Sequence, residues 1–287
     1  MKITKKSLLA LVLSLLMVVS ICSVSVPAEA ASSKKSVTLY VGEVLKVWAI
    51  GGSINKVSSN KKKVCAVKKK SGDAILTAKK PGKAVVTMKN KRGTITYTVT
   101  VKKKPFSVTT TPIKEGVMIS VKNTTAPFIS SVSLQVTFCD AAGNPINQST
   151  RYVDYIGKGQ TGYEDVYCYD AGIDFTKTQV KVLEWSRSLD YKYKNYASKV
   201  NMSWTEEPST YGTKLKFSAN SNYSGKGSIY IASDVICYDG AGQILGVITG
   251  SAYLYSAKNV YTDTYGVTLP DGTVRYEVVS KRAILKY

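Results

Sequence analysis

Short runs of β-branched and aromatic residues, interrupted by turn-forming residues about every eight to ten positions, dominate residues 34–103, and residues 106–287 again show strand-like runs separated by turns. The pattern is clearest in 94–101, where β-branched and aromatic residues follow one another through eight positions. Such runs are typical of strands, and regular turn signals at this spacing are typical of β-sandwiches and barrels. No segment between residues 34 and 103 has the period of an amphipathic helix. The pattern therefore predicts an all-β protein made of β-sandwich modules in tandem.

The first thirty residues have the pattern of an export signal. A basic start precedes an apolar run over residues 8–24, and an A-x-A cleavage pattern follows it. We expect cleavage after Ala30 rather than an uncleaved membrane anchor. Lipidation of Cys22 is disfavoured, because Ile21 stands where a lipoprotein signal needs a small residue. No second apolar span follows, so we expect a secreted protein associated with the cell surface and without a transmembrane anchor.

The absence of histidine limits the chemistry that this chain can perform. It excludes Ser-His-Asp and Cys-His nucleophiles, a histidine general base and histidine-ligated zinc. The adjacent carboxylates of Glu164 and Asp165 would point to opposite faces of a strand, so they could not form one acid–base pair. The same holds for Glu206 and Glu207. We therefore expect a protein that is not an enzyme and that uses no cofactor or metal.

Positive charge is concentrated in one part of the chain. The whole sequence has 40 Lys and Arg against 19 Asp and Glu, a net charge of +21. Residues 31–104 hold 19 basic and 2 acidic residues, which gives 19 − 2 = +17, whereas 105–287 hold 18 and 16, which gives 18 − 16 = +2. The change in composition coincides with the linker-like Lys102–Pro105. We predict a basic module at 31–104 and two further modules at 105–197 and 198–287.

Four segments of the basic module resemble the group-2 bacterial Ig-like domain. They are Val41-Gly42-Glu43, residues 57–67 with a V-S-S-N stretch followed by V-C-A-V, residues 76–87 with L-T-A-K-K-P-G-K-A-V-V-T, and the closing segment Tyr97–Val101. The resemblance implies a β-sandwich of the kind found in bacterial surface and secreted proteins, often adhesins or spacers. It implies no particular ligand and no catalytic residue.

The basic residues of this module form clusters that we expect at the turns. Together with Lys102–Lys104 there are five clusters, and alternating strand directions would place three of them at one end of the sandwich and two at the other. Such a field suits an anionic cell-wall polymer or another extracellular polyanion, whereas sequence-specific nucleic-acid binding is not expected. The alternative is a solvated lysine surface that only keeps an exported protein soluble. The candidate polyanion-binding residues are Lys61, Lys62, Lys63, Lys68, Lys69, Lys70, Lys79, Lys80, Lys83, Lys89, Lys91 and Arg92.

Residues 106–287 show a weak internal repeat. Residues 116–123 match 212–220 at an offset of 96, and residues 136–143 match 235–242 at an offset of 99. Each copy contains a D-x-x-G element after an apolar run, which predicts a tight turn with the glycine at positive φ. The copies loosely resemble the F-x-L-Y-D-type β-sandwich modules of secreted proteins, and this implies two further sandwiches.

Tyrosine is unusually frequent in the two copies, which hold 18 of the 20 tyrosines. Tyrosine suits a half-buried strand surface, and this is one explanation. The other is a set of aromatic faces that bind a glycan or a protein ligand. The candidate stacking residues are Tyr163, Tyr167, Tyr191, Tyr193 and Trp185.

Four cysteines follow the predicted cleavage site. Cys139 and Cys168 share one module, so they are the pair expected to bridge if a disulfide forms, and the alternative is two buried thiols. Cys65 and Cys237 occupy apolar runs and are expected in cores.

Taken together, these patterns predict an exported, non-enzymatic adhesion or ligand-binding protein that its basic module retains at an anionic envelope. Two alternatives stay open: an accessory carbohydrate-binding protein, and an envelope scaffold or spacer without a ligand.

Overall fold

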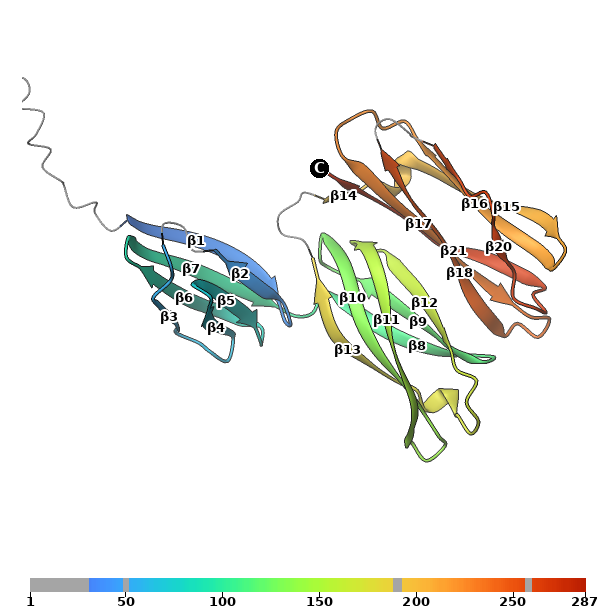
Figure 1. The fold of residues 1–287 in the computed structure, drawn as a ribbon, viewed down its shortest axis with the longest axis horizontal. Helices are drawn as coiled ribbons and strands as arrows, with labels where there is room; N and C mark the ends of the chain where they lie inside the picture. Colours follow the sequence, from blue (N-terminus) through green and yellow to red (C-terminus); the bar gives the residue numbers. More distant parts are fainter. Residues whose placement is uncertain (1–30, 49–51, 188–192, 256–259) are drawn as a thin grey trace, which may run out of the picture. The chain divides into compact units, whose positions relative to one another are not determined.

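A computed structural model describes residues 31–48, 52–187, 193–255 and 260–287 (Figure 1). Within these ranges the regular structure is β-strand except for two short 3₁₀ turns, η1 (Phe175–Lys177) and η2 (Ala197–Lys199), so the predicted all-β class is confirmed. The chain divides into two compact units between Lys102 and Lys103, two residues before the predicted boundary. No helix in the described ranges is long and apolar enough to cross a membrane. The predicted export signal lies outside them.

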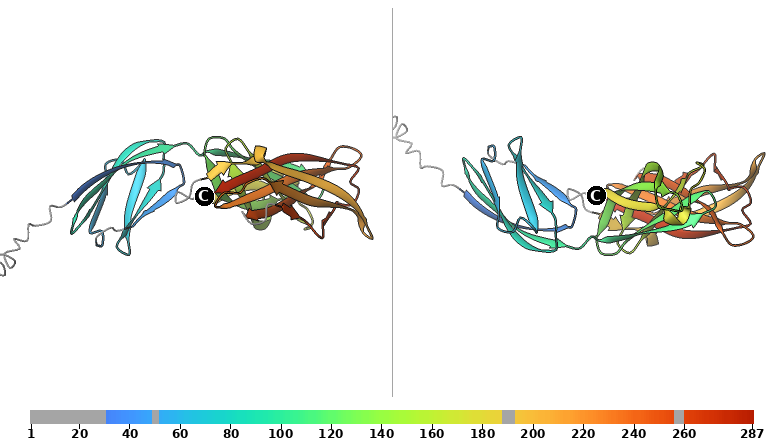
Figure 2. Two further views of the ribbon diagram at one scale, coloured as in Figure 1. Left: turned by 90° about the horizontal axis from the view of Figure 1, so that it is seen from above. Right: turned by 90° about the horizontal axis from the view of Figure 1, so that it is seen from below.

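The N-terminal unit is a sandwich of two sheets whose layers face one another in Figure 2. β1 and β7 are parallel, and the other neighbours are antiparallel. Leu39, Leu76, Val86 and Val99 are fully buried in the core between the sheets. One sheet has the order β1 (Ala31–Tyr40), β7 (Gly93–Lys102), β6 (Gly82–Asn90), β3 (Lys56–Ser59), and the other has the order β2 (Val44–Val47), β5 (Asp73–Ala78), β4 (Cys65–Lys70).

The C-terminal unit contains two sandwiches, one for each predicted copy. We call the sheets inner and outer by their place in the unit. In the first copy the outer sheet is β11 (Pro145–Gly157), β10 (Phe128–Cys139), β13 (Gln179–Ser186), and the inner sheet is β12 (Thr161–Tyr167), β9 (Gly116–Asn123), β8 (Phe106–Ile113). In the second copy the inner sheet is β14 (Tyr193–Asn195), β21 (Arg275–Lys286), β17 (Ser228–Tyr238), β18 (Ile244–Tyr255). Its outer sheet contains β15 (Val200–Ser209), β16 (Gly212–Ser221), β19 (Val260–Thr262) and β20 (Val267–Thr268).

The two copies share the same hairpin. In β10 the register shifts between Phe138 and Cys139, and in β17 it shifts between Cys237 and Tyr238, which are the matching positions at an offset of 99. The turn that follows has the same construction in both copies. The side chain of Asp140 accepts a hydrogen bond from the backbone N–H of Asn144, and that of Asp239 accepts one from the backbone N–H of Gln243. Each distance is 2.8 Å. The glycine of each D-x-x-G element has positive φ, 87° at 143 and 81° at 242, as predicted.

The boundary predicted between residues 197 and 198 is too late. β14 pairs with β21 through Tyr193–Lys286, so it belongs to the second copy, which has begun by residue 193. A three-residue strand carries too little periodicity to be recognised in the sequence.

The two copies pack against one another through their inner sheets. Met118 of β9 and Ile236 of β17 lie in one buried cluster together with Ile113. Their repeat equivalents on the outer sheets are polar, with Lys214 at the position of Met118 and Thr137 at that of Ile236. At these two positions the residue is therefore apolar where the copies meet and polar in the sheet that does not face the other copy.

Candidate functional site

Two hydrogen bonds bring two lysine clusters of the N-terminal unit to the same end of the sandwich. The side chain of Asn60 accepts from Val85 N at 2.8 Å, and the carbonyl of Val64 accepts from Lys79 N at 2.8 Å. The segments around Lys61–Lys63 and Lys79–Lys83 thus lie at the end of the sandwich where β3 ends and β6 begins. We call the side chains of Lys61, Lys62, Lys63, Lys79, Lys80 and Lys83 the first basic end.

The remaining candidates lie at the opposite end. Asn55 N donates to the carbonyl of Lys89 at 2.8 Å, and Ile54 N donates to that of Gly72 at 2.7 Å, which ties the β4–β5 turn to the end of β6. Lys68–Lys70 are the last residues of edge strand β4 rather than a turn, so the prediction is wrong for these three. Lysines on an edge strand also disfavour pairing with another chain. The second basic end comprises Lys68, Lys69, Lys70, Lys89, Lys91 and Arg92.

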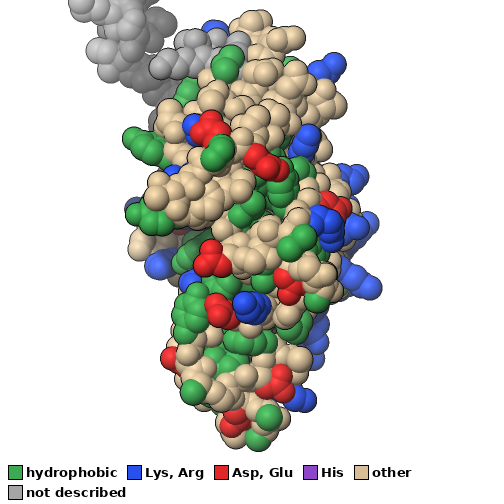
Figure 3. Space-filling view, turned by 90° about the vertical axis from the view of Figure 1, so that its right-hand side faces the viewer, with side chains coloured by type: hydrophobic (Ala, Val, Ile, Leu, Met, Phe, Trp, Pro, Cys, Tyr) green, Lys and Arg blue, Asp and Glu red, His purple; other side chains and the backbone are tan. Residues whose placement is uncertain are grey.

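The acidic residues of the N-terminal unit do little to offset this charge. All twelve candidate side chains are exposed. Glu43, by contrast, is only 6% exposed and accepts a hydrogen bond from Tyr40 N at 2.7 Å. Asp73 lies 3.2 Å from Lys46 Nζ. The C-terminal unit differs, because acidic side chains occur across its face drawn in Figure 3.

The predicted stacking residues do not form one surface. Trp185 is 7% exposed and packs edge-to-face on Phe106 at 5.4 Å, so it is a core residue and the stacking prediction is wrong for it. Tyr193 stacks on buried Phe128 at 4.1 Å, and Tyr163 packs against the apolar cluster between the copies. Tyr191 lies outside the described residues.

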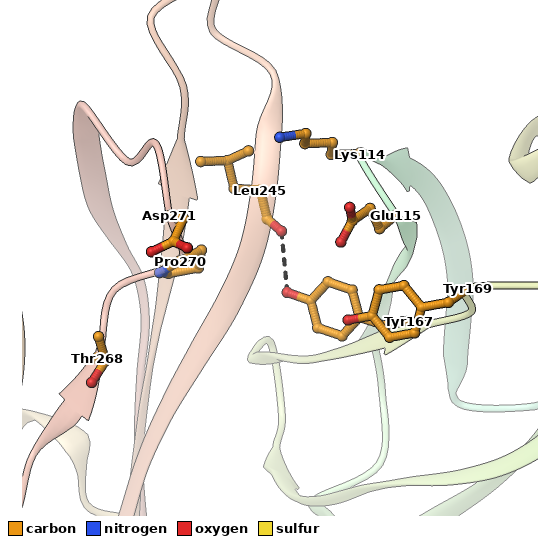
Figure 4. Close-up of a pocket in the computed structure, with 8 residues that line it drawn as sticks. All are labelled: Lys114, Glu115, Tyr167, Tyr169, Leu245, Thr268, Pro270 and Asp271. Carbon is orange, nitrogen blue, oxygen red and sulfur yellow. Dashed lines mark hydrogen bonds between the residues drawn. The ribbon is translucent and has the colours of Figure 1, made fainter. Parts of the chain in front are cut away.

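Tyr167 joins the two copies. Its hydroxyl lies 3.1 Å from the carbonyl oxygen of Leu245, to which it donates (Figure 4), and 3.0 Å from a carboxylate oxygen of Asp165. That same oxygen of Asp165 accepts from Val247 N at 2.8 Å. Burial, followed by the negative charge of Asp165, raises the pKa of the Tyr167 hydroxyl, which therefore stays a neutral donor.

A partly buried carboxylate lies beside this junction. Burial and then the charge of Asp165 raise the pKa of Glu164 to about 7. Arg151, whose Nε lies 3.8 Å from Glu164, acts in the opposite direction, but its guanidinium is itself partly exposed. Desolvation of the Glu164 carboxylate therefore raises its pKa by more than the long and partly solvated ion pair with Arg151 lowers it.

A crevice of about 430 Å³ opens where the β8–β9 turn meets the second copy. We call it the seam crevice. Tyr169, which is 77% exposed, contributes one wall, and its ring lies parallel to that of Tyr167 with 6.4 Å between centroids. Of the lining residues, only Tyr167 was predicted from the sequence as a stacking residue, because the turns at 114–115 and 268–271 lie more than 150 positions apart in the chain. The crevice is lined by Lys114, Glu115, Tyr167, Tyr169, Leu245, Thr268, Pro270 and Asp271 (Figure 4).

Of the two alternatives for Cys139 and Cys168, a disulfide or two buried thiols, the structure contains the thiols. Cys139 and Cys168 are both free and buried. The thiol of Cys139 contacts the carbonyl of Thr137, and that of Cys168 contacts the carboxylate of Asp170, each at 3.7 Å. The alternative of two buried thiols therefore describes this structure. Within the described ranges no group of three or more His, Cys, Asp or Glu side chains is placed to hold a metal ion.

No family model matches the chain, and no curated protein matches it. Among solved structures, the chain is similar to native alpha-2-macroglobulin from Escherichia coli, spanning domains MG0-NIE-MG1. The identity is 12%, the match covers 83% of this chain and 86% of that chain, and the TM-score is 0.16. A likeness this low carries no argument, so the two family resemblances of the sequence remain predictions.

Proposed function

We propose that this protein is an exported, non-enzymatic surface protein whose N-terminal unit binds an anionic cell-wall polymer and so retains the ligand-binding C-terminal unit at the envelope. The observation that supports this proposal is the pair of basic ends. Each end gathers six exposed cationic side chains, while the acidic residues of the same unit are buried or paired.

The spacing of these charges suits a flexible polymer better than a compact ligand. Clusters at both ends of one sandwich can contact successive phosphates or sulfates, and each contact releases counterions from the polymer. The screening length in physiological salt is about 8 Å, so contacts of this kind weaken steeply as salt rises.

The test is binding of residues 31–287 to soluble poly(glycerol phosphate) and to purified cell walls across a salt series. We expect the logarithm of the affinity to fall linearly with the logarithm of the salt concentration. The triple variant Lys61→Gln, Lys62→Gln, Lys63→Gln should bind more weakly and reduce the slope by up to about three units, since each lysine–phosphate ion pair accounts for roughly one unit.

A matched triple variant of exposed lysines in the C-terminal unit provides the control. Lys122→Gln, Lys158→Gln, Lys177→Gln removes the same charge from the chain but leaves both basic ends intact. Equal losses of affinity in the two triple variants, or binding that does not respond to salt, would refute the proposed role of the basic ends.

A further inference from the structure

We propose that the seam crevice is a second, independent ligand site that binds a neutral oligosaccharide. This proposal does not depend on polyanion binding, because its residues all belong to the C-terminal unit.

The crevice is held in shape by hydrogen bonds between and within the copies. Lys114 N donates to the carbonyl of Ile244 at 3.3 Å, which fixes the β8–β9 turn against β18. Cys168 N donates to the carbonyl of Glu115 at 3.0 Å, which fixes the segment bearing Tyr169 against the same turn. The hydrogen bond between Tyr167 and Leu245, which both line the crevice, fixes β12 against β18. The site is therefore formed before a ligand arrives, and its volume lies in the range of small-ligand pockets, about 300–1,000 Å³.

Tyr169 provides an aromatic face that the fold itself does not use. Its ring is largely exposed, and the Tyr167 ring lies parallel to it. Tyr167 is anchored by its hydroxyl, so the ring on which Tyr169 stacks has a fixed orientation. An exposed tyrosine on a rigid support offers a large contact area at a small cost in side-chain entropy. The apolar C–H face of a sugar ring is a flat surface of matching chemistry.

The polar groups around this wall include both donors and acceptors. Lys114 and the Thr268 hydroxyl can donate, whereas Glu115 and Asp271 accept. In Figure 4 the residues of the two copies face one another across the crevice, with Glu115 on one side and Asp271 on the other. Sugar hydroxyls both donate and accept hydrogen bonds, so a polyhydroxylated ligand can satisfy this mixed set.

Charge and shape favour a neutral sugar over other ligands. The lining carries one positive and two negative side chains, a net charge of 1 − 2 = −1, which disfavours the polyanions that suit the N-terminal unit. Its aliphatic residues are limited to Leu245 and Pro270, and Leu245 is buried, so the crevice offers little apolar depth for the side chain of a bound peptide.

The experiment uses residues 31–287 on an array of neutral and acidic oligosaccharides, followed by calorimetry with the best neutral tetrasaccharide. We expect neutral glycans to bind and acidic ones to bind only through the basic ends, at low salt. Tyr169→Ala should lower the affinity for the neutral glycan at least tenfold. Asp271→Asn should also lower this affinity, and the variant should remain folded. Both effects should persist at high salt, which separates this site from the polyanion site.

Tyr211→Ala is the matched control, because Tyr211 is 80% exposed and does not line the crevice. It should bind the neutral glycan like the unmodified chain, as should the triple variant of Lys61–Lys63. The proposal is overturned if no neutral glycan on the array binds, or if binding survives both Tyr169→Ala and Asp271→Asn. Binding only to peptides in a parallel peptide array would also overturn it.

Discussion

Arg282 and Asp234 form an ion pair that is almost completely removed from water. Nη2 of Arg282 lies 2.9 Å from Oδ1 of Asp234, and the two side chains are 4% and 0% exposed. Thr249 and Ser280 donate further hydrogen bonds to the carboxylate, and Nη1 of Arg282 donates to the carbonyl of Asp154 in the first copy. The pair therefore links the two sandwiches of the C-terminal unit. Each charge is buried, so each needs the opposite charge of the other residue.

Removing one member of this pair should destabilise the protein strongly. Arg282→Met leaves Asp234 buried without its counter-charge, and the expected cost is about 3–5 kcal/mol of unfolding free energy. Arg275→Met is the control, because Arg275 and Glu277 are 3.6 Å apart and both more than half exposed, a class of pair worth about 0–1 kcal/mol. Chemical denaturation of both variants measures the difference, and similar losses of stability in the two would contradict the prediction.

A side chain at position 246 should destabilise the protein, because Gly246 lies where the copies touch. A Cβ at this position would come within 2.1 Å of the Tyr167 hydroxyl oxygen. We expect Gly246→Ala to cost about 1–3 kcal/mol through overpacking. Gly240→Ala, whose Cβ would meet only a Val274 methyl at 3.9 Å, should be nearly neutral.

The double variant Gly246→Ala, Tyr167→Phe tests the cause of that destabilisation. Phenylalanine lacks the oxygen that clashes, so the double variant should lose less stability than the sum of the two single variants. Strictly additive effects, measured by thermal or chemical unfolding, would show that Tyr167 is not the residue that excludes a side chain at 246.

The strands, the core and the repeat could be predicted from local patterns, but the packing of the copies could not. Alternation predicts the strands of the N-terminal unit apart from short β3, whose Ser58-Ser59 pair is typical of a turn. Cys65 and Cys237 are core residues as predicted. Met118 and Ile236, however, lie on strand faces that local alternation assigns to solvent, and only the partner copy buries them. The stacking prediction fails for Trp185 for a related reason, since a strand pattern does not say which of its two faces is covered.

Glu164 should make stability fall as the pH rises through the weakly acidic range. Its pKa of about 7 in the folded chain lies above its ordinary value of 4.5, so between these values the folded state binds more protons than the unfolded state. The contribution of this group is therefore most favourable below pH 4.5 and is lost by about pH 7. Since 35% of the side chain is exposed, solvent reduces the size of the effect.

Glu164→Gln tests this linkage, because glutamine mimics the protonated acid. The measurement is the free energy of unfolding from denaturant titrations. The variant should have the same value as the unmodified chain near pH 4.5 and a higher value at pH 8. Exposed Glu184→Gln is the control and should not change the pH profile. A Glu164→Gln variant that is less stable at pH 8 would show that the ion pair with Arg151 outweighs burial.

The four buried thiols should all be titratable once the chain is unfolded. Residues 31–287, denatured without reductant, should react with four equivalents of a thiol reagent, whereas a bridge between Cys139 and Cys168 would leave two. The native protein should react slowly, because all four thiols are buried, and burial raises the pKa of Cys237 to about 11, so little thiolate is present at neutral pH. Cys139→Ser, Cys168→Ser serves as the control and should give two equivalents with or without reductant. Two equivalents from the unmodified chain without reductant and four after reduction would establish the bridge instead.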